Sequence, residues 1–201
     1  MAGLTYNKNI NNVLLCLIIL VNLYVIITPV IPTLVFSFGS HTGRKQQLVQ
    51  KLHTQPKPAT SQPAAVSQPN QLTIPAMLLD QPVLEGRDTY AVLNKGILHW
   101  PASSTPDKGS NTVLIGHRFT YSVPKGVFYH LDKLKPGDEI GLTWNSKRYI
   151  YTVASSTVVP PTQTSILNAS TDPQITLFTC TPLMWPKDRL VVVAKLSGVV
   201  R

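Results

Sequence analysis

The sequence predicts an all-β domain that folds as a closed or nearly closed barrel with short helices, preceded by an N-terminal transmembrane helix and a linker. Three observations lead to this prediction. Residues 13–36 are apolar and carry no charge, and residues 55–71 are rich in Pro and Gln. From residue 72 onward the chain contains short β-like runs, with no long amphipathic helix and no internal repeat.

The apolar segment at 13–36 is long enough to cross a bilayer, since a helix of that length spans about 36 Å. Pro29 and Pro32 kink or end it, so residues 13–27 are its strongest part. An uncleaved signal anchor is favoured over a cleaved signal peptide, because Lys8 is the only basic residue before the segment and no small-x-small cleavage site follows. Residues 1–12 are then a short cytoplasmic terminus.

Charge is distributed unevenly along this chain of net charge +9. No acidic residue precedes Asp80, so part of the basic excess lies beside the apolar segment. Arg44, Lys45 and Lys51 follow that segment, and a positive-inside count would leave the downstream domain in the cytoplasm. The remaining basic residues are scattered through turns rather than clustered with aromatic residues, which argues against nucleic-acid binding.

Residues 37–71 are predicted to be a juxtamembrane segment and a Pro/Gln-rich linker, because such a composition is extended and buries no core. The folded unit is therefore expected at residues 72–201, a usual size for one domain.

Turn residues divide this unit into strands. Trp144-Asn-Ser-Lys-Arg148 is typical of a hairpin connection between two alternating runs. Short helical pieces are expected at 88–95, 127–134 and 164–167. The predicted strands are 72–78, 111–116, 139–144, 148–155, 174–179 and 189–196.

The two cysteines, Cys16 and Cys180, predict no intramolecular disulfide, because Cys16 lies within the apolar segment. The five histidines show no i, i+4 pairing, and a lone downstream thiol provides no Cys-rich metal site. We therefore expect no structural zinc.

Three residues at strand edges suggest covalent acyl chemistry. Cys180 ends one β-like run, His117 ends another, and Arg189 begins a third. A thiolate attacks a carbonyl, an imidazole moves protons, and a guanidinium stabilises developing negative charge. Each residue alone has a simpler explanation: a core cysteine, a histidine bonded to a backbone carbonyl, or a surface arginine. Arg118 adds positive charge beside His117 and would disfavour a second proton on its ring.

Taken together, these residues resemble the sortase family of cysteine transpeptidases. The resemblance rests on Thr176-Leu-Phe-Thr-Cys180 for the family's TLxTC strand, on Gly116-His117 upstream, and on Arg189 opening the next strand. The short connection between Cys180 and Arg189, with the segments 95–101 and 116–121, looks most like class E and next like class D. The resemblance implies a sortase-like closed barrel of about eight strands.

The resemblance also implies the site. The catalytic residues would be His117, Cys180 and Arg189. Trp100 stands where relatives often have Tyr, and His99 either lines the site or fixes its loop. The implied substrate-binding residues are His99, Trp100, Tyr121 and Thr179.

The implied function is that of a membrane-anchored enzyme with an extracellular catalytic domain, against the charge count. It would cleave an LPxTG- or LAxTG-type sorting motif near the C-terminus of a secreted protein through a thioacyl enzyme. The acceptor would be an amine of a peptidoglycan precursor or a pilin lysine. No cofactor is implied, and the dispersed acidic residues give no reason to assume calcium activation.

Other functions fit the residues less well. An L,D-transpeptidase would show a Ser-His-Gly-Cys cluster, and NlpC/P60-type peptidases place the cysteine before the histidine. One alternative stays open: a non-enzymatic, membrane-tethered β-barrel binding module in which Cys180 is a structural core residue.

Overall fold

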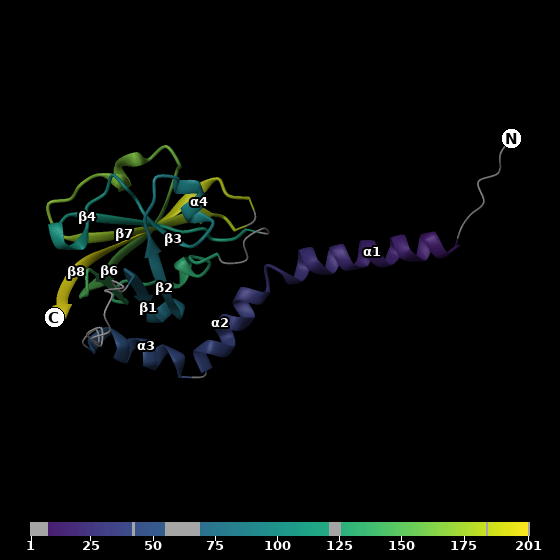
Figure 1. Cartoon of the computed structure of the whole chain (residues 1–201), viewed down its shortest axis with the longest axis horizontal. Coiled ribbons are helices and arrows are strands. Elements are labelled where there is room, and N and C mark those ends of the chain that lie inside the picture. The colour runs from purple at the N-terminus through teal and green to yellow at the C-terminus, as the bar shows by residue number, and fades with distance from the viewer. Residues whose placement is uncertain (1–7, 42, 55–68, 121–125, 184, 201) are drawn as a thin grey trace, which may run out of the picture.

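The computed structural model describes residues 8–41, 43–54, 69–120, 126–183 and 185–200. Within these residues eight strands form a closed barrel in the order β1-β2-β3-β4-β7-β8-β6-β5 (Figure 1). This architecture confirms the predicted β-barrel. The strands are β1 (Gln71–Ile74), β2 (Leu79–Leu84), β3 (Ile97–His99), β4 (Asn111–Ile115), β5 (Glu139–Trp144), β6 (Lys147–Val159), β7 (Gln174–Thr181) and β8 (Asp188–Val200).

Most neighbouring strands are antiparallel, but β2 with β3 and β4 with β7 form parallel pairs. The long strands β6 and β8 pair along most of their length. As a result β4, β7 and β8 lie side by side, although other strands separate β4 from β7 in the sequence.

Two strands, β2 and β3, were not expected from the sequence. The predicted strand at 72–78 is shorter than expected, because Pro75 opens the 3₁₀ helix η1 (Pro75–Met77) and Leu78 then adopts a left-handed conformation with φ 54°. The chain resumes as β2, which contains Pro82, and β3 has only three residues. Neither shows the regular alternation that identifies a strand.

The predicted hairpin at 144–148 is confirmed. Trp144 pairs with Lys147, and the two loop residues Asn145 and Ser146 both have positive φ, 48° and 65°. Two central residues of positive φ define a type I′ turn, whose twist matches that of the flanking strands.

Each of the three predicted helical segments, 88–95, 127–134 and 164–167, contains a short helix. Asp88 caps α4 (Thr89–Leu93) by accepting a hydrogen bond of 3.0 Å from the Ala91 N–H. The 3₁₀ helix η4 (Thr164–Leu167) has the predicted bounds. The 3₁₀ helix η3 (Leu131–Lys133) lies within the predicted segment 127–134, whereas η2 (Pro106–Lys108) was not predicted.

The barrel interior holds the hydrophobic core. Ile175 and Leu177 of β7 belong to it, together with Leu190 and Val192 of β8. Because side chains alternate along a strand, Phe178 and Cys180 point to the opposite, outer face of β7. Both are only partly buried, as an outward direction requires.

Three helices precede the barrel: α1 (Lys8–Ile27), α2 (Ile31–His41) and α3 (Arg44–His53). Figure 1 shows α1 projecting away from the barrel, while α2 and α3 run along its lower side. One helical stretch in the described residues, Asn9–Ile27, is long and apolar enough to cross a membrane. The structure therefore divides the predicted segment 13–36 at residues 28–30, and its last part belongs to α2.

Helix α3 packs against the barrel, although the sequence placed it in a juxtamembrane segment and linker at 37–71. Its Leu48 and Leu52 side chains are buried, and Gly141 of β5 leaves room for Leu52. The Arg148 guanidinium donates hydrogen bonds to the backbone carbonyls of Lys51 and Thr54 at the end of α3. The Pro-rich part of the predicted linker, residues 55–68, lies outside the described residues. We call α2 and α3 together the N-terminal strap.

Candidate active site

The candidate site lies where β4, β7 and β8 end or begin at the same edge of the barrel. β4 and β7 are parallel with Ile115 opposite Phe178. Continuing this register by two residues brings His117 level with Cys180. On the other side of β7, Cys180 is the direct partner of Arg189 in the antiparallel pairing with β8. The fold therefore brings the three predicted catalytic residues onto neighbouring strands.

Cys180 is positioned by β7 to face outward. Directly opposed residues on antiparallel strands have side chains on the same face of the sheet, so Cys180 and Arg189 share the outer face. Cys180 is a free thiol of intermediate exposure, not a core residue. A thiol at this position is accessible to a ligand, in contrast to the inert buried cysteine that the sequence left as an alternative.

His117 follows β4 and is held by its backbone. Its carbonyl accepts a hydrogen bond of 3.1 Å from the Phe128 N–H, and the preceding Gly116 N–H donates to the Phe178 carbonyl at 3.4 Å. Gly116 is required by this close packing, because a Cβ there would lie 2.6 Å from a methyl group of Val127. The loop thus fixes the histidine at the edge of β7.

The His117 ring sits in a partly desolvated position. Its Nε2 atom is buried and has no hydrogen-bond partner among the described residues. Burial lowers the pKa of His117 below its ordinary value of 6.5, because a charged ring loses hydration there. The neutral ring is therefore the main form at neutral pH. The charge of Arg118, which the sequence suggested as a cause, is not among the causes of this shift.

Arg118 instead forms part of a cross-strand clamp around the two reactive residues. Its Nη1 donates a hydrogen bond of 2.6 Å to the Thr181 hydroxyl. The Thr179 hydroxyl donates one of 2.7 Å to the Gly116 carbonyl. The neighbours of His117 on both sides are thus bonded to the neighbours of Cys180 on both sides.

The clamp is anchored further by two groups from the segment after residue 126. Arg118 Nη2 lies 3.3 Å from Asp132 Oδ1, and its Nε donates to the Tyr129 carbonyl at 3.5 Å. Sequence reasoning did not find the clamp. The signal available was an arginine directly after the candidate histidine and a threonine directly after the candidate cysteine.

The Arg189 guanidinium has donors left for a ligand. Within the described part of the chain, it makes one hydrogen bond, from Nη1 to the carbonyl of Asp188 at 3.1 Å. A guanidinium carries five N–H donors, so most of them remain available at the edge beside Cys180. No group of three or more His, Cys, Asp or Glu side chains in the described residues is arranged to hold a metal ion.

Among the described residues that were predicted to bind substrate, Trp100 lies away from this edge and Thr179 lies at it. β3 runs antiparallel to β4, so the Trp100 N–H bonds to the carbonyl of Val113, four residues before His117. At about 3.3 Å per residue, this separation is roughly 13 Å along the strand. Thr179 is buried with its hydroxyl in the clamp. Tyr121 lies outside the described residues.

His99 is buried and held by hydrogen bonds. Its Nδ1 lies 2.9 Å from Glu85 Oε1, and its Nε2 donates to the Ser104 carbonyl at 3.1 Å. Its ring also meets the Trp144 ring edge-on at 5.0 Å between centroids. These contacts favour the loop-fixing role that the sequence offered for His99; a part in substrate binding stays a prediction.

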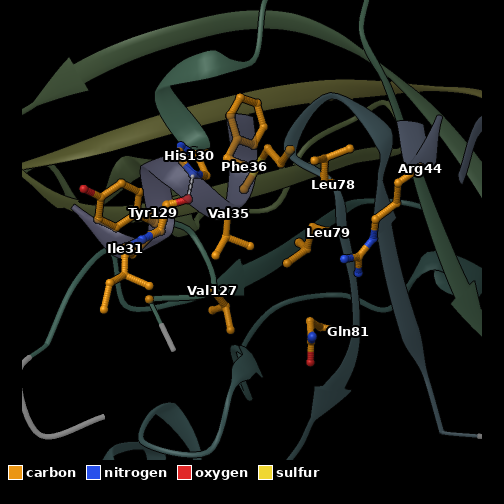
Figure 2. Close-up of a pocket in the computed structure, with 13 residues that line it drawn as sticks. Ile31, Val35, Phe36, Arg44, Leu78, Leu79, Gln81, Val127, Tyr129 and His130 are labelled. Carbon is orange, nitrogen blue, oxygen red and sulfur yellow. Dashed lines mark hydrogen bonds between the residues drawn. The ribbon is translucent and has the colours of Figure 1, made fainter. Parts of the chain in front are cut away.

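Two cavities flank α2 beside the site. The first, of about 410 Å³, is bordered by Phe36, Arg118, Asp132 and Leu183. Leu183 lies three residues after Cys180, so α2 forms one wall of the surface next to the reactive edge. The second, of about 360 Å³, lies between α2 and the start of β2 (Figure 2). Val127, which packs against Gly116, lines this second cavity.

Known proteins that are similar to this chain in sequence and in fold include sortases. Sortase SrtE1 of Streptomyces coelicolor is 33% identical over 140 residues, which are 62% of this chain and 39% of that protein. Sortase D of Bacillus subtilis is 30% identical over 130 residues, which are 64% of this chain and 60% of that protein. The aligned part of the chain therefore spans less than two thirds of either relative.

Solved structures agree. Sortase D5, a transpeptidase of Clostridium perfringens, superposes with a TM-score of 0.57 at 31% identity, over 64% of this chain and 78% of that chain. Sortase E1 of Streptomyces coelicolor, with a tripeptide in its active site, also gives a TM-score of 0.57 at 31% identity, over 65% of this chain and 88% of that chain.

The resemblance inferred from the sequence is thereby confirmed, with class E and class D proteins among the relatives. The model of the sortase domain family matches residues 72–197, which are more than half of the chain. The match includes every strand from β2 to β7 and the residues Cys180 and Arg189. The chain belongs to the sortase family.

Proposed function

We propose that this protein is a membrane-anchored cysteine transpeptidase acting on the sorting motif of secreted proteins. The observation that carries the proposal is the register that pairs Cys180 with Arg189 and brings His117 to the same edge of β7. Membership of the sortase family, whose aligned relatives include a transpeptidase, supports the same reaction.

In the first half-reaction, the Cys180 thiolate attacks the threonine carbonyl of an LPxTG- or LAxTG-type motif. The resulting oxyanion is stabilised by the Arg189 guanidinium, whose donors face the same side of the sheet. Protonated His117 gives its proton to the departing amine as the carbon–nitrogen bond breaks. A thioester between Cys180 and the substrate acyl group remains.

In the second half-reaction, an amine attacks the thioester carbonyl and neutral His117 takes up its proton. The carbon–sulfur bond breaks, Cys180 returns as the thiolate, and a new amide joins the substrate to the acceptor. The acceptor class is an amine of a peptidoglycan precursor or a pilin lysine. Arg189 supports both steps, because negative charge develops on the same oxygen in each.

The barrel is proposed to lie outside the membrane, anchored by α1. The apolar stretch Asn9–Ile27 supports the anchor, whereas the positive charges after it oppose this orientation. Protease added to intact cells should cleave the barrel if it is external. Complete protection of the barrel until the membrane is permeabilised would place it in the cytoplasm and overturn this part of the proposal.

The alternative of a non-enzymatic binding module required Cys180 to be a core residue. Its partial exposure on the outer face of β7 favours the enzyme instead. Native labelling separates the two functions: a thiol reagent should modify Cys180 in the folded protein, with a Cys16→Ser background removing the second thiol.

The decisive experiment is mass spectrometry of the full-length protein in detergent micelles, incubated with LPxTG and LAxTG peptides. We expect a covalent adduct of the acyl mass on Cys180, lost when an amine is added and absent in Cys180→Ala. Arg189→Ala should slow adduct formation on the order of 100- to 1000-fold. No adduct with either peptide from a protein whose Cys180 reacts with thiol reagents would contradict the proposed substrate class.

A further inference from the structure

An open apolar groove separates α2 from the barrel, and nothing in the proposed reaction uses it. We call it the α2 groove; its walls are Ile31 and Val35 of α2 on one side and Leu78, Leu79 and Val127 on the other. Figure 2 shows these side chains directed toward a common space of about 360 Å³. Ile31 and Val35 are one helical turn apart and remain 49% and 61% exposed. Apolar side chains thus line a groove that no other described residue fills.

The groove begins next to the apolar helix α1. Only residues 28–30 separate the end of α1 at Ile27 from the start of α2 at Ile31. The connection is fixed to the barrel, because the Tyr129 hydroxyl donates a hydrogen bond of 2.6 Å to the Pro29 carbonyl and His130 Nε2 donates one of 3.2 Å to the Pro32 carbonyl. If α1 spans the bilayer, the α2 groove lies at the level where the hydrocarbon ends and the headgroups begin.

The charge along the groove favours an anion at its far end. Arg44, the first residue of α3, is exposed and lines the groove. No ion pair or hydrogen bond from described residues occupies its guanidinium, and no acidic side chain is among the lining residues. An apolar channel that ends in an unpaired guanidinium matches an acyl chain attached to a phosphate group.

We propose that the α2 groove binds one anionic phospholipid of the membrane, with an acyl chain between Val35 and Leu79 and its phosphate at Arg44. The inference rests on the proposed membrane anchor. The bound lipid holds α2 against the barrel, and α2 is also a wall of the cavity beside Arg118 and Leu183. Lipid binding therefore also stabilises the wall that α2 forms beside the edge that carries Cys180.

The test uses the full-length protein in vesicles of phosphatidylglycerol that carries a photoreactive group on its acyl chain. After illumination, cross-linked peptides are identified by mass spectrometry. We expect cross-links in α1. We also expect cross-links at residues 77–81 and 126–130, the two segments that form the barrel wall of the groove. Cross-links in α1 without any in these barrel segments would overturn the groove while leaving the anchor standing. The absence of cross-links in α1 would overturn the anchor, and the groove proposal with it.

Two matched variants separate specific binding from mere closeness to the membrane. Val35→Glu places a carboxylate in the groove and should reduce the barrel cross-links at least about 10-fold, since a charge in hydrocarbon is unfavourable. Val158→Glu changes an equally exposed valine of β6 and should leave them unchanged. Equal yields of the barrel cross-links in Val35→Glu and wild type, or an equal loss in Val158→Glu, would contradict a lipid in the groove.

The role of Arg44 is tested with the same cross-linking readout. In Arg44→Gln, the preference for phosphatidylglycerol over phosphatidylcholine should fall about 5-fold, which corresponds to one basic residue near an anionic surface. An unchanged preference would contradict a phosphate at Arg44 and overturn the assignment of the anionic lipid.

Discussion

Hydrogen bonds between residues next to Cys180 and His117 hold together the two segments that carry these candidate catalytic residues. The hydrogen bond from Arg118 to Thr181 joins the two loops on one side, and the bond from Thr179 to Gly116 joins them on the other. Strand register alone places backbones, whereas proton transfer requires side chains within hydrogen-bonding reach. The clamp supplies the additional restraint.

Thr181→Val should therefore impair catalysis without abolishing folding. The change removes the acceptor of Arg118 Nη1 and leaves this partly buried charged donor without that partner. The free energy of unfolding should fall by about 1–3 kcal/mol. Displacement of the reactive groups should lower kcat/KM roughly 10- to 100-fold, mainly through kcat. Steady-state kinetics with a sorting-motif peptide measure the effect. Thr181→Ser keeps the hydroxyl and serves as the control; if it is as slow as Thr181→Val, the hydrogen bond from Arg118 is not what the reaction requires.

The titration of His117 should reveal its desolvation. Burial lowers the pKa of His117, so the proton that the departing amine requires is lost as the pH rises through a value below 6.5. We predict that NMR of the His117 ring protons, followed from about pH 5 to about pH 9, gives a titration midpoint below 6.5. A midpoint above 6.5 would show that the ring is better hydrated or paired with a negative charge.

Cys180, His117 and Arg189 could be proposed as catalytic residues from the sequence because each stands at a fixed place in a strand motif. The registers of β4 with β7 and of β7 with β8 bring these three residues to one edge of the barrel. The clamp could not be identified in the same way, because a hydrogen bond between Arg118 and Thr181 depends on side-chain direction across strands that other elements separate. The same limit affected Trp100: only the antiparallel register of β3 with β4 shows how far it lies from His117.

Among the secondary-structure elements, α3 contributes more to stability than its sequence indicated. Its Leu52 side chain is fully buried against β5, while Val49 on the same helix is 37% exposed. Leu52→Ala should lower the free energy of unfolding by about 2–5 kcal/mol, since it removes buried apolar contact and leaves a cavity. Val49→Ala should change it by no more than about 0.5 kcal/mol. Chemical denaturation of both variants tests this; equal effects would mean that α3 is not docked in solution.

The elements that the sequence predicted well are those with regular alternation or a defined turn. β5 and the 144–148 hairpin are examples, because a two-residue loop fixes the pairing of the strands on either side. β3 and the strap were harder for a physical reason. A three-residue strand shows no period, and α3 offers only two buried leucines, so its docking depends on Arg148 and Asp80, which come from distant strands.

At the scale of the whole molecule, the strap connects α1 to the barrel, and its helix α3 packs against the barrel through Leu48 and Leu52. We predict that a chain lacking residues 1–27 unfolds at nearly the same temperature as the full-length protein. A chain lacking residues 1–54 loses the burial of Leu48 and Leu52, each worth about 1.5–3 kcal/mol, and its melting temperature should fall on the order of 10 °C. Circular dichroism on heating compares the two; identical melting would show that the barrel is independent of the strap.

The place of β8 between β7 and β6 in the barrel affects the order in which the strands pair during folding. β8 lies between β7 and β6, and β7 pairs with β4, so the last two strands to be synthesised complete the interior of the barrel. Such non-local pairings are slow to form, because loops must close before the contacts stabilise them. Until then the earlier strands expose open edges, which favour aggregation. Cys180 and Arg189 reside on these two late strands, so a chain in which β7 and β8 are not yet paired carries no assembled thiol site.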